Sequence, residues 1–443
     1  MSARDLARKI CDTLRRNGHH ALLVGGCVRD LVLGREPADY DVATDATPEQ
    51  VLVLFPESIA VGAQFGVVLV VDGESKVEVA TFRSDVGYSD GRHPDRVVYA
   101  RTPEEDVQRR DFTINGLLMR PETGEVLDFV GGQADIRAGV IRAIGEPERR
   151  FAEDKLRMMR AVRFAARFGY TIEPATFEAI RRHAGEIIRV SNERIRDECT
   201  KLLTEGASRR GFELLDESGL LHVVLPEVAR MKGVKQPPQF HPEGDVWIHT
   251  RLMLQQLPPG CSPTLAWGVL LHDVGKPPTF TPTSDDQERI RFDGHVEVGT
   301  RMADEICLRL RFSGDDTAQV LALVANHLRF KDVEQMRLST LKRFVRLPRF
   351  EDHLELHRLD CLSSHRNLDA YEFVTKFLRE TPPSKVRPPR LVTGDDLRDL
   401  GLPPGPLYGE ILRAVEDAQL EGRLASRQDA LTFARQLASG EKT

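Results

Sequence analysis

The chain has 443 residues and a formal net charge of −6 at pH 7, with 41% hydrophobic and 29% charged residues. This length is too great for one compact core, and about three domains are expected. The acidic balance disfavours a protein coated in nucleic acid over its whole surface, although it allows a local basic face.

The sequence predicts neither a membrane span nor a secretory signal. No apolar run approaches the about 20 residues that cross a bilayer, and residues 1–20 are charged throughout. We therefore expect a cytoplasmic protein with no membrane partner. The cysteines are far apart and lack a C-x-x-C pair, so reduced thiols are expected rather than disulfides or zinc ligands. They are Cys11, Cys27, Cys199, Cys261, Cys307 and Cys361.

A glycine turn follows the first predicted strand. After a leading helix, the apolar residues 22–24 predict a buried strand, and Gly25 and Gly26 come directly after it. Adjacent glycines let the backbone turn sharply and approach a ligand closely. Arg29 lies on a short helix expected over 28–33, and a helix start beside an arginine suits phosphate groups.

Two aspartates follow this turn, two residues apart. Asp39 and Asp41 are expected at the end of a second strand, where side chains at i and i+2 point to the same face. Two carboxylates on one face suit Mg²⁺, a hard cation that prefers oxygen ligands and substrate phosphates. A solvated acidic edge is the alternative, but the G-G-x-V-R-D motif upstream favours a site for phosphate and metal.

A helix and a hairpin are predicted next. The helix is expected over 48–57, and two strands over 61–73 and 76–83 join at an Asp-Gly turn. Glu78 on the second strand is either a third metal-facing carboxylate or, as is more common for a lone glutamate, a solvent-facing one. Residues 84–100 lack periodicity and predict a surface loop, either a connector or a loop that gates a substrate site.

A charged cluster precedes the next apolar run. Arg109, Arg110 and Asp111 lie just before a run that is expected to be helical, and Asp111 would cap that helix. In the functional alternative, an arginine and the carboxylate reach a nucleotide sugar and triphosphate. Residues 126–132 predict a strand that enters a Gly-Gly turn, with Asp128 at its centre.

From residue 145 onward the sequence predicts helices to the end, and the first of them are basic. Asp154, Arg157, Arg160 and Arg163 recur at intervals of three, which places them on one flank of a helix. Two interpretations are equally supported by the spacing. One is an exposed helix with weak ion pairs. The other is base readout, because an aspartate accepts and an arginine donates hydrogen bonds to nucleobase edges.

Five ordered motifs resemble those of the bacterial-type (class II) tRNA nucleotidyltransferases and the related bacterial poly(A) polymerases. The resemblance implies an α+β fold, in which a nucleotidyltransferase head, a DNA polymerase β-like mixed sheet with helices, precedes all-helical neck, body and tail domains. Expected bounds are 1–145 for the head, 146–235 for the nucleotide-selecting and RNA-binding neck, 236–365 for the body and 366–443 for the tRNA-binding tail. The motifs are GGCVRD with DYD, RRDFTIN, LDFVGG, EDKLRMMRAVRF and NERIRDECTKLL.

The same resemblance implies a role for each matching residue. Asp39 and Asp41 would hold Mg²⁺ as catalytic residues, while the tRNA 3′-OH attacks the α-phosphorus of an NTP and pyrophosphate leaves. Glu193 and Arg194 would brace the helix that selects CTP and then ATP. The nucleotide-binding set is Gly25, Gly26, Arg29, Arg110, Asp111, Asp154, Arg157, Arg160 and Arg163, of which the last four would form the selecting template.

A second constellation lies between about residues 240 and 365. A His-Asp pair with distant His and Asp is ligand chemistry for a divalent metal, and the segment resembles the HD phosphohydrolase family. His249, His272, Asp273 and Asp360 match its core pattern, and His295 and His327 match positions that add a second metal. The metal would be Mn, Ni, Co or Mg, and the substrate a phosphomonoester or 2′,3′-cyclic phosphate at an RNA end. In the alternative, the helical body keeps its ligands but only holds tRNA.

The resemblance predicts addition of C, C and A to the tRNA 3′ end from CTP and ATP without a nucleic-acid template. The long loop at 84–100 disfavours a CC-only enzyme, and the lack of a long basic C-terminal extension favours tRNA over poly(A) tailing. The alternatives are an A-adding enzyme or poly(A) polymerase, an HD phosphohydrolase with an RNA-holding head, and a non-catalytic RNA chaperone.

Overall fold

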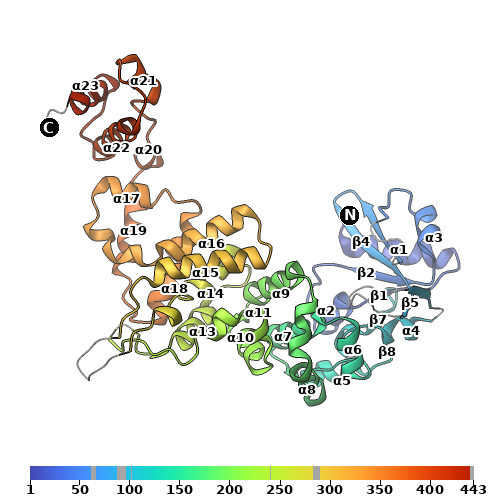
Figure 1. Cartoon of the computed structure of the whole chain (residues 1–443). Helices are drawn as coiled ribbons and strands as arrows, with labels where there is room; N and C mark the ends of the chain where they lie inside the picture. The colour runs from blue at the N-terminus through green and yellow to red at the C-terminus, as the bar shows by residue number, and fades with distance from the viewer. Residues whose placement is uncertain (61–65, 87–95, 101, 240, 283–289, 440–443) are drawn as a thin grey trace. The chain divides into compact units, whose positions relative to one another are not determined.

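A mixed sheet with helices, followed by helices, is the architecture of the computed structural model (Figure 1). It describes residues 1–60, 66–86, 96–100, 102–239, 241–282 and 290–439. Within these ranges, no helix has both the length and the apolar character needed to cross a membrane. The chain divides into two units: Met1–Ala229 with Pro258–Gly260 and Arg309–Arg311, and Arg230–Leu257 with Cys261–Leu308 and Phe312–Thr443.

The head sheet has six strands in the order β3-β4-β2-β1-β7-β8. Neighbouring strands are antiparallel except for β2 and β4, which are parallel. The mixed sheet and the β3–β4 hairpin are therefore as predicted, and among the described residues the first hairpin strand covers Val67–Asp72. The strands are β1 (Ala21–Val24), β2 (Asp41–Thr44), β3 (Val67–Asp72), β4 (Ser75–Thr81), β7 (Leu117–Met119) and β8 (Val126–Asp128).

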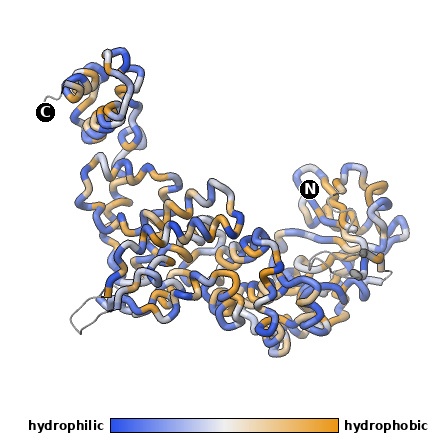
Figure 2. Tube along the Cα trace, in the orientation of Figure 1, coloured by the Kyte–Doolittle hydropathy of each residue, from blue (hydrophilic) through white to orange (hydrophobic). Residues whose placement is uncertain are grey.

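Apolar side chains join the sheet to its helices. Val24, Ala43 and Leu118 belong to one buried cluster. Helix α1 (Ala3–Arg16) packs on β1, β2 and β4 and buries Ile10 and Leu14. Burying one such side chain contributes roughly 1.5–3 kcal/mol, so α1 helps to fix the strands. Figure 2 shows hydrophobic and hydrophilic residues alternating along most helices, as expected where one helix face is buried.

The acid pair lies at the start of a strand, and the prediction that it ends one is wrong. Strand β2 begins at Asp41, and Asp39 lies in the preceding loop. The apolar residues that pair with β1, Val42 and Ala43, come after the acids. Because a buried strand needs these apolar side chains, it forms downstream of the pair. The short helix α2 (Gly26–Val32) begins two residues before its expected start.

The prediction of a helix after Asp111 is also wrong. Helix α4 (Pro103–Gln108) precedes the cluster, and a short 3₁₀ turn, η2 (Thr113–Asn115), leads directly into β7. A short apolar run does not distinguish a strand from a helix by periodicity. The chain packs closely at Gly116, where an added Cβ would lie 2.8 Å from Val130 Cγ2.

The segment 84–100 is not a plain loop, which corrects that prediction. Strand β5 (Arg83–Val86) pairs antiparallel with β6 (Arg96–Tyr99). The adjacent β-branched residues Val97 and Val98 favour this pairing over an irregular connector. The predicted gating function concerns mainly residues 87–95, which lie outside the described residues, as do residues 61–65 of the expected hairpin.

The remainder of the first unit is helical apart from one small pair of strands. Strands β9 (Val140–Ile141) and β10 (Thr171–Ile172) are parallel, so the prediction of helices alone after residue 145 misses β10. Helix α7 packs on α9 and α10. The main helices are α5 (Gly132–Ala138), α6 (Pro147–Glu153), α7 (Leu156–Phe168), α8 (Pro174–His183), α9 (Asn192–Thr204), α10 (Ser208–Glu217), α11 (Leu220–Val224) and α12 (Pro226–Ala229).

Helices carry the second group of predicted ligands. Every residue of α14 after Pro263 is buried, as expected for a helix that is apolar all round, and α14 packs on α13, α16 and α18. Each predicted ligand lies on or beside one of these elements, as expected. They are α13 (Val246–Gln256), α14 (Pro263–Leu271), α15 (His295–Arg309), α16 (Gly314–Asn326), η5 (His327–Gln335) and α18 (Phe350–Ser363).

The C-terminal helices have a separate small core. Val392, Leu397 and Val415 belong to one buried cluster. Lys342 of α17 (Leu338–Phe344) donates to the Leu420 carbonyl at 2.7 Å, which joins this part to α17. The remaining helices are α19 (Asp369–Glu380), α20 (Pro383–Val386), α21 (Gly394–Asp399), α22 (Pro406–Leu420) and α23 (Arg427–Ser439).

Candidate functional site

The acid pair presents its carboxylates at the start of strand β2 in the head sheet. Asp39 is exposed and Asp41 half-buried, while Tyr40 between them is buried, so the two acids lie on the accessible side. Asp41 is in register with Glu78 on the parallel strand β4. Burial, Glu78 and Asp39 raise the pKa of Asp41 to about 6 against the opposing charge of Arg110. Carboxylates that repel one another in this way fit a divalent cation.

Arg29 is held by internal partners beside the glycine turn. Gly25 has φ +78, which favours glycine, and it directly precedes α2. The Arg29 side chain is 6% exposed and binds Asp30 at 2.8 Å. It also donates to Asn115 Oδ1 at 2.7 Å, and its guanidinium lies 4.7 Å from the centre of the Phe168 ring. These contacts hold the Arg29 side chain in place beside the glycine turn.

Arg110 and Asp111 belong to two adjoining ion pairs. Arg110 and Arg109 each lie 2.8 Å from the buried carboxylate of Asp106. Asp111 accepts hydrogen bonds from the backbone of Phe112 at 2.8 Å and from Arg160 Nε at 2.9 Å. Burial opposes ionisation of Asp111, but Arg160 and Arg157 outweigh it and lower its pKa to about 2.

Asp154 is not on the helix that carries the three arginines, which corrects the expected shared flank. It ends α6 with extended backbone, φ −144 and ψ 108. Its carboxylate accepts from the backbone N–H of Leu156 at 3.0 Å. Both carboxylate oxygens are bound by Arg194 of α9, at 2.7 and 3.2 Å. Arg194 thus holds Asp154 in place, whereas Glu193, the other predicted brace, is exposed.

The three arginines of α7 point to different partners. Arg157 donates to Glu153 at 2.8 Å and to the Arg109 carbonyl at 2.9 Å. Arg160 is about one-third exposed and binds Asp111, as described above. Arg163 is buried and binds Glu198 of α9 at 2.7 Å. Arg157 and Arg160 therefore contact head residues, whereas Arg163 faces the packing between α7 and α9.

Three of the predicted HD histidines share one hydrogen-bonding arrangement. His272, His295 and His327 each place Nδ1 against the carbonyl of the residue three positions earlier, at 2.9, 2.8 and 2.7 Å. That carbonyl fixes the proton on Nδ1 and leaves Nε2 as a bare ligand. All three Nε2 atoms are buried and have no hydrogen-bond partner among the described residues. This is the arrangement that a metal would satisfy.

Two groups of ligand atoms meet at Asp273. His249, His272 and Asp360 form one group, and Asp273, His295 and His327 form another, each within 4.8 Å. Asp273 Oδ2 lies 3.1 Å from His272 Nε2 and 2.7 Å from Lys276 Nζ. Burial opposes ionisation of Asp273, but His272 and Lys276 outweigh it and hold its pKa well below the usual value. A site for two cations that share Asp273 fits this geometry.

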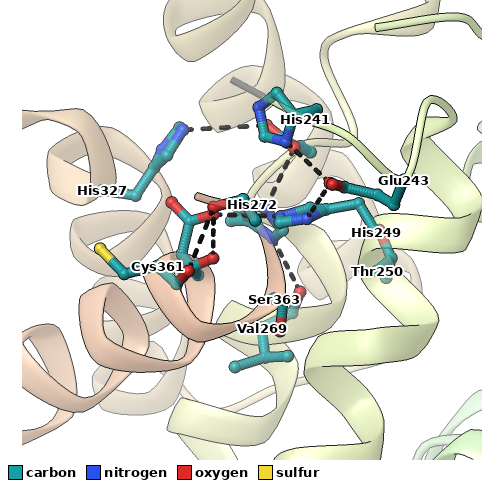
Figure 3. Close-up of polar contacts among 12 residues, drawn as sticks. His241, Glu243, His249, Thr250, Val269, His272, His327, Cys361 and Ser363 are labelled. Atoms are coloured by element: carbon teal, nitrogen blue, oxygen red, sulfur yellow. Dashed lines mark hydrogen bonds and ion pairs between the residues drawn. The ribbon is translucent and has the colours of Figure 1, made fainter. Parts of the chain in front are cut away.

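His241 and Glu243 adjoin this cluster and were missed in the sequence. They form a further group of possible ligands with His249, and Figure 3 shows Glu243 directed at His249. Their only sequence signal is an H-P-E-G-D turn just before α13, which resembles an ordinary connector. Burial lowers the pKa of His241 despite its hydrogen bond to Glu243.

A cavity of about 690 Å³ opens beside the cluster. The predicted ligands His295 and Asp360 line it, and so does His241. Its other walls carry cations and an aromatic ring, which are suited to phosphate and to a flat base. These residues are Lys276, Arg291, Phe292 and Lys331.

Three families match successive parts of the chain. Residues 21–142 match the Poly A polymerase head domain. Residues 169–232 match the family described as the probable RNA and SrmB-binding site of polymerase A. Residues 245–358 match the HD domain.

Similar proteins extend over nearly the whole chain. A CCA-adding enzyme of Levilactobacillus brevis is 33% identical over 97% of this chain and 97% of its own length. One from Leuconostoc mesenteroides is 32% identical over 96% and 94%. The crystal structure of the Bacillus stearothermophilus CCA-adding enzyme in complex with CTP superposes with a TM-score of 0.75 at 27% identity, over 100% of this chain and 99% of that one.

Proposed function

The chain belongs to the CCA-adding enzymes, a nucleotidyltransferase family, and on that premise we propose that its head adds C, C and A to the 3′ end of tRNA from CTP and ATP. The observation that carries the mechanism is the accessible acid pair Asp39 and Asp41 at the start of β2, where Asp41 is in register with Glu78 of β4. Solvated surface acids would need no such register. Repulsion between Asp41 and its acidic neighbours Glu78 and Asp39 favours binding of a cation between them.

Asp39 and Asp41 would hold Mg²⁺ at the start of β2. When bound, Mg²⁺ neutralises charge on the triphosphate and eases deprotonation of the tRNA 3′-OH. The 3′-OH oxygen forms the new bond to the α-phosphorus, and the bond to pyrophosphate breaks. Arg110, close enough to Asp41 to oppose the rise in its pKa, supplies positive charge to the departing phosphates. The glycine turn at Gly25 and Gly26 leaves room for the triphosphate.

The nucleotide is selected where α7 adjoins the head. Asp154 accepts and Arg157 donates, so together they can distinguish the edges of C and A from those of U and G. Their internal partners Arg194 and Glu153 hold them in fixed positions. Arg160 and Asp111 join this selecting group to the nucleotide pocket. Arg29 and Arg163 are buried among protein partners and support the site from behind.

The acid pair tests the proposed transfer. Asp39→Ala/Asp41→Ala should abolish addition of every nucleotide to tRNA that lacks CCA, measured with labelled CTP and ATP. Thermal unfolding checks the fold, and Asp45→Ala, a nearby head aspartate, is the matched control. Residual addition by the double variant above about one-thousandth of the wild-type rate would contradict the assignment.

The second metal cluster favours an additional hydrolase activity. Buried, unpartnered Nε2 atoms on three fixed histidines favour metal binding over a body that only holds tRNA. The metal is Mn, Ni, Co or Mg, and the adjoining basic cavity suits a phosphomonoester or 2′,3′-cyclic phosphate at an RNA end. Release of phosphate from 3′-phosphorylated or cyclic-ended RNA, lost in His272→Ala, tests this activity.

Four functional segments follow from this assignment. The head (1–145) carries the transfer site, the neck (146–235) selects the nucleotide and binds RNA, the HD body (236–365) carries the second metal cluster, and the tail (366–443) binds tRNA. All six cysteines, each within the described ranges, are free thiols, which accords with the proposed cytoplasmic location.

A further inference from the structure

Glu243 is a buried carboxylate that the proposed HD centre does not use as a ligand. Its side chain is 6% exposed, and Oε1 lies 2.7 Å from His249 Nδ1. The same oxygen lies 2.9 Å from His241 Nδ1. Figure 3 shows His249 with Glu243 on one side of its ring and the remaining metal-binding cluster on the other.

His249 differs from the other three HD histidines in how Nδ1 is fixed. In those three the backbone carbonyl three residues earlier performs this task. The corresponding carbonyl for His249 belongs to Val246, and it instead accepts a hydrogen bond from Thr250 Oγ1 at 2.9 Å. Nδ1 of His249 therefore needs a partner from outside its own helix, and the Glu243 carboxylate lies close enough to be that partner.

The turn before α13 fixes Glu243 in this position. Gly244 has φ +78 and donates to the His241 carbonyl at 2.9 Å. Asp245 begins α13 by accepting from the backbone of Ile248 at 3.0 Å. The carboxylate is thus held by the segment just before α13, at Nδ1 of His249, whereas Asp360 lies 3.1 Å from Nε2 of the same ring.

We propose that Glu243 is a positioning residue that keeps the proton of His249 on Nδ1 and so presents Nε2 to a divalent metal shared with His272 and Asp360. The inference rests on the proposed HD centre. The contact is bent, since neither His249 nitrogen makes a well-aligned hydrogen bond. A carboxylate in this place orients the ring and makes Nε2 a stronger ligand than a carbonyl partner would.

Metal affinity tests this role without relying on hydrolysis. Mn²⁺ binding is measured by calorimetry on the full chain carrying Asp39→Ala/Asp41→Ala, so that the head site does not contribute. Adding Glu243→Ala should weaken Mn²⁺ binding by about 10- to 100-fold. Adding Glu243→Gln should weaken it less than about fivefold, because the amide oxygen still accepts from Nδ1–H. Thermal unfolding confirms that each variant folds.

Two controls separate Glu243 from its surroundings. Glu355→Ala removes a carboxylate of α18 that binds Arg358 at 2.7 Å, and Mn²⁺ affinity should not change. His241→Ala should weaken binding less than threefold, because Glu243 acts through His249. An equal loss in His241→Ala and Glu243→Ala would overturn the inference by making His241 the residue that matters.

The remaining outcomes distinguish the inference from the function on which it rests. Unchanged Mn²⁺ affinity in Glu243→Ala, or a Glu243→Gln variant as weak as Glu243→Ala, would overturn the positioning role alone. Failure of the parent chain to bind Mn²⁺ would overturn the HD centre itself, and this inference with it.

Discussion

Arg160 and Asp111 link the nucleotide-selecting helix to the head, with Nε and Nη2 of the arginine 2.9 and 2.7 Å from the same carboxylate oxygen. The arginine comes from α7, and the aspartate lies between α4 and η2. Asp111 is almost fully buried, and its pKa is lowered to about 2. The pair therefore stays ionised at neutral pH and holds the two parts of the proposed pocket together.

Loss of Asp154 should change which nucleotide is added. Asp154→Ala removes an acceptor, and a well-placed hydrogen-bonding pair discriminates bases by about 1–3 kcal/mol. We expect the preference for CTP over UTP to fall roughly 10- to 100-fold. The measurement is kcat/KM for each of the four NTPs on tRNA that lacks CCA. An equal loss with all four NTPs would show that Asp154 does not select the base.

Arg194 should share this effect, although it is not expected to touch the nucleotide. It holds both carboxylate oxygens of Asp154, so Arg194→Ala should relax the same preference by several-fold. Arg196→Ala is the matched control on α9, because Arg196 pairs with Asp197. If the Arg194 and Arg196 variants behave alike, the brace is not specific to Asp154.

Arg163 should affect stability rather than nucleotide choice. Its buried pair with Glu198 has a nitrogen–oxygen distance of 2.7 Å, and removal of one partner leaves a buried charge that costs about 3–5 kcal/mol. Arg163→Met should lower the free energy of unfolding by that amount in urea denaturation. Arg163→Met/Glu198→Leu should recover much of it. A changed CTP-to-ATP preference at unchanged stability would restore Arg163 to the selecting group.

Asp41 should lower the free energy of unfolding at pH values at which its carboxyl group is ionised. Its pKa in the folded state, about 6, lies above the ordinary 3.8, so the folded state binds the proton more tightly. The resulting stabilisation is present below about pH 4 and is lost as the pH rises through 6. Without added metal, Asp41→Asn should therefore raise the free energy of unfolding by about 1–2 kcal/mol at pH 7.5.

The pH dependence supplies the control for Asp41. The gain should disappear near pH 4, and the exposed Asp39→Asn should change stability by less than about 0.5 kcal/mol at either pH. At pH 7.5, saturating Mg²⁺ should make the wild type more stable than Asp41→Asn, because the ion stabilises the wild type alone. A gain in Asp41→Asn that is equal at both pH values would exclude repulsion among these acids as the cause.

The two proposed sites should separate cleanly by mutation. His272→Ala removes a ligand of the second cluster and should abolish hydrolysis of cyclic-ended RNA. Addition of C and A should remain within about twofold of wild type, since the transfer site uses only head and neck residues. Colorimetric phosphate release and a gel-based extension assay measure the two activities. Parallel loss of both would mean that His272 supports the fold rather than a separate centre.

The sequence predicts residue types at the sites better than their local geometry. The mixed sheet and the HD ligand set follow from the family resemblances of the motifs, and the helical placement of these ligands follows from the apolar patterns around them. Asp154 shows the limit: intervals of three predict one helix flank, yet the chain breaks between α6 and α7 because Asp154 adopts extended backbone and bonds to Leu156. The carboxylate at this break binds Arg194, which lies 40 residues away and which no local pattern relates to Asp154.

Burial is the other quantity that spacing does not show. Arg29 and Arg163 carry the same charge as Arg110, but they bind Asn115 and Glu198 inside the protein. Glu243 was missed for the same reason. Only the folded turn brings its carboxylate to His249, and no short sequence pattern relates the two residues.

The central claim is ordered, untemplated addition of C, C and A, and extension of three tRNA substrates tests it most directly. tRNAs ending in -N, -NC and -NCC are each incubated with one labelled NTP and wild-type enzyme. The account predicts that CTP extends the first two, ATP extends -NCC, and UTP and GTP extend none efficiently. Extension of -NCC alone would identify an A-adding enzyme and contradict the account.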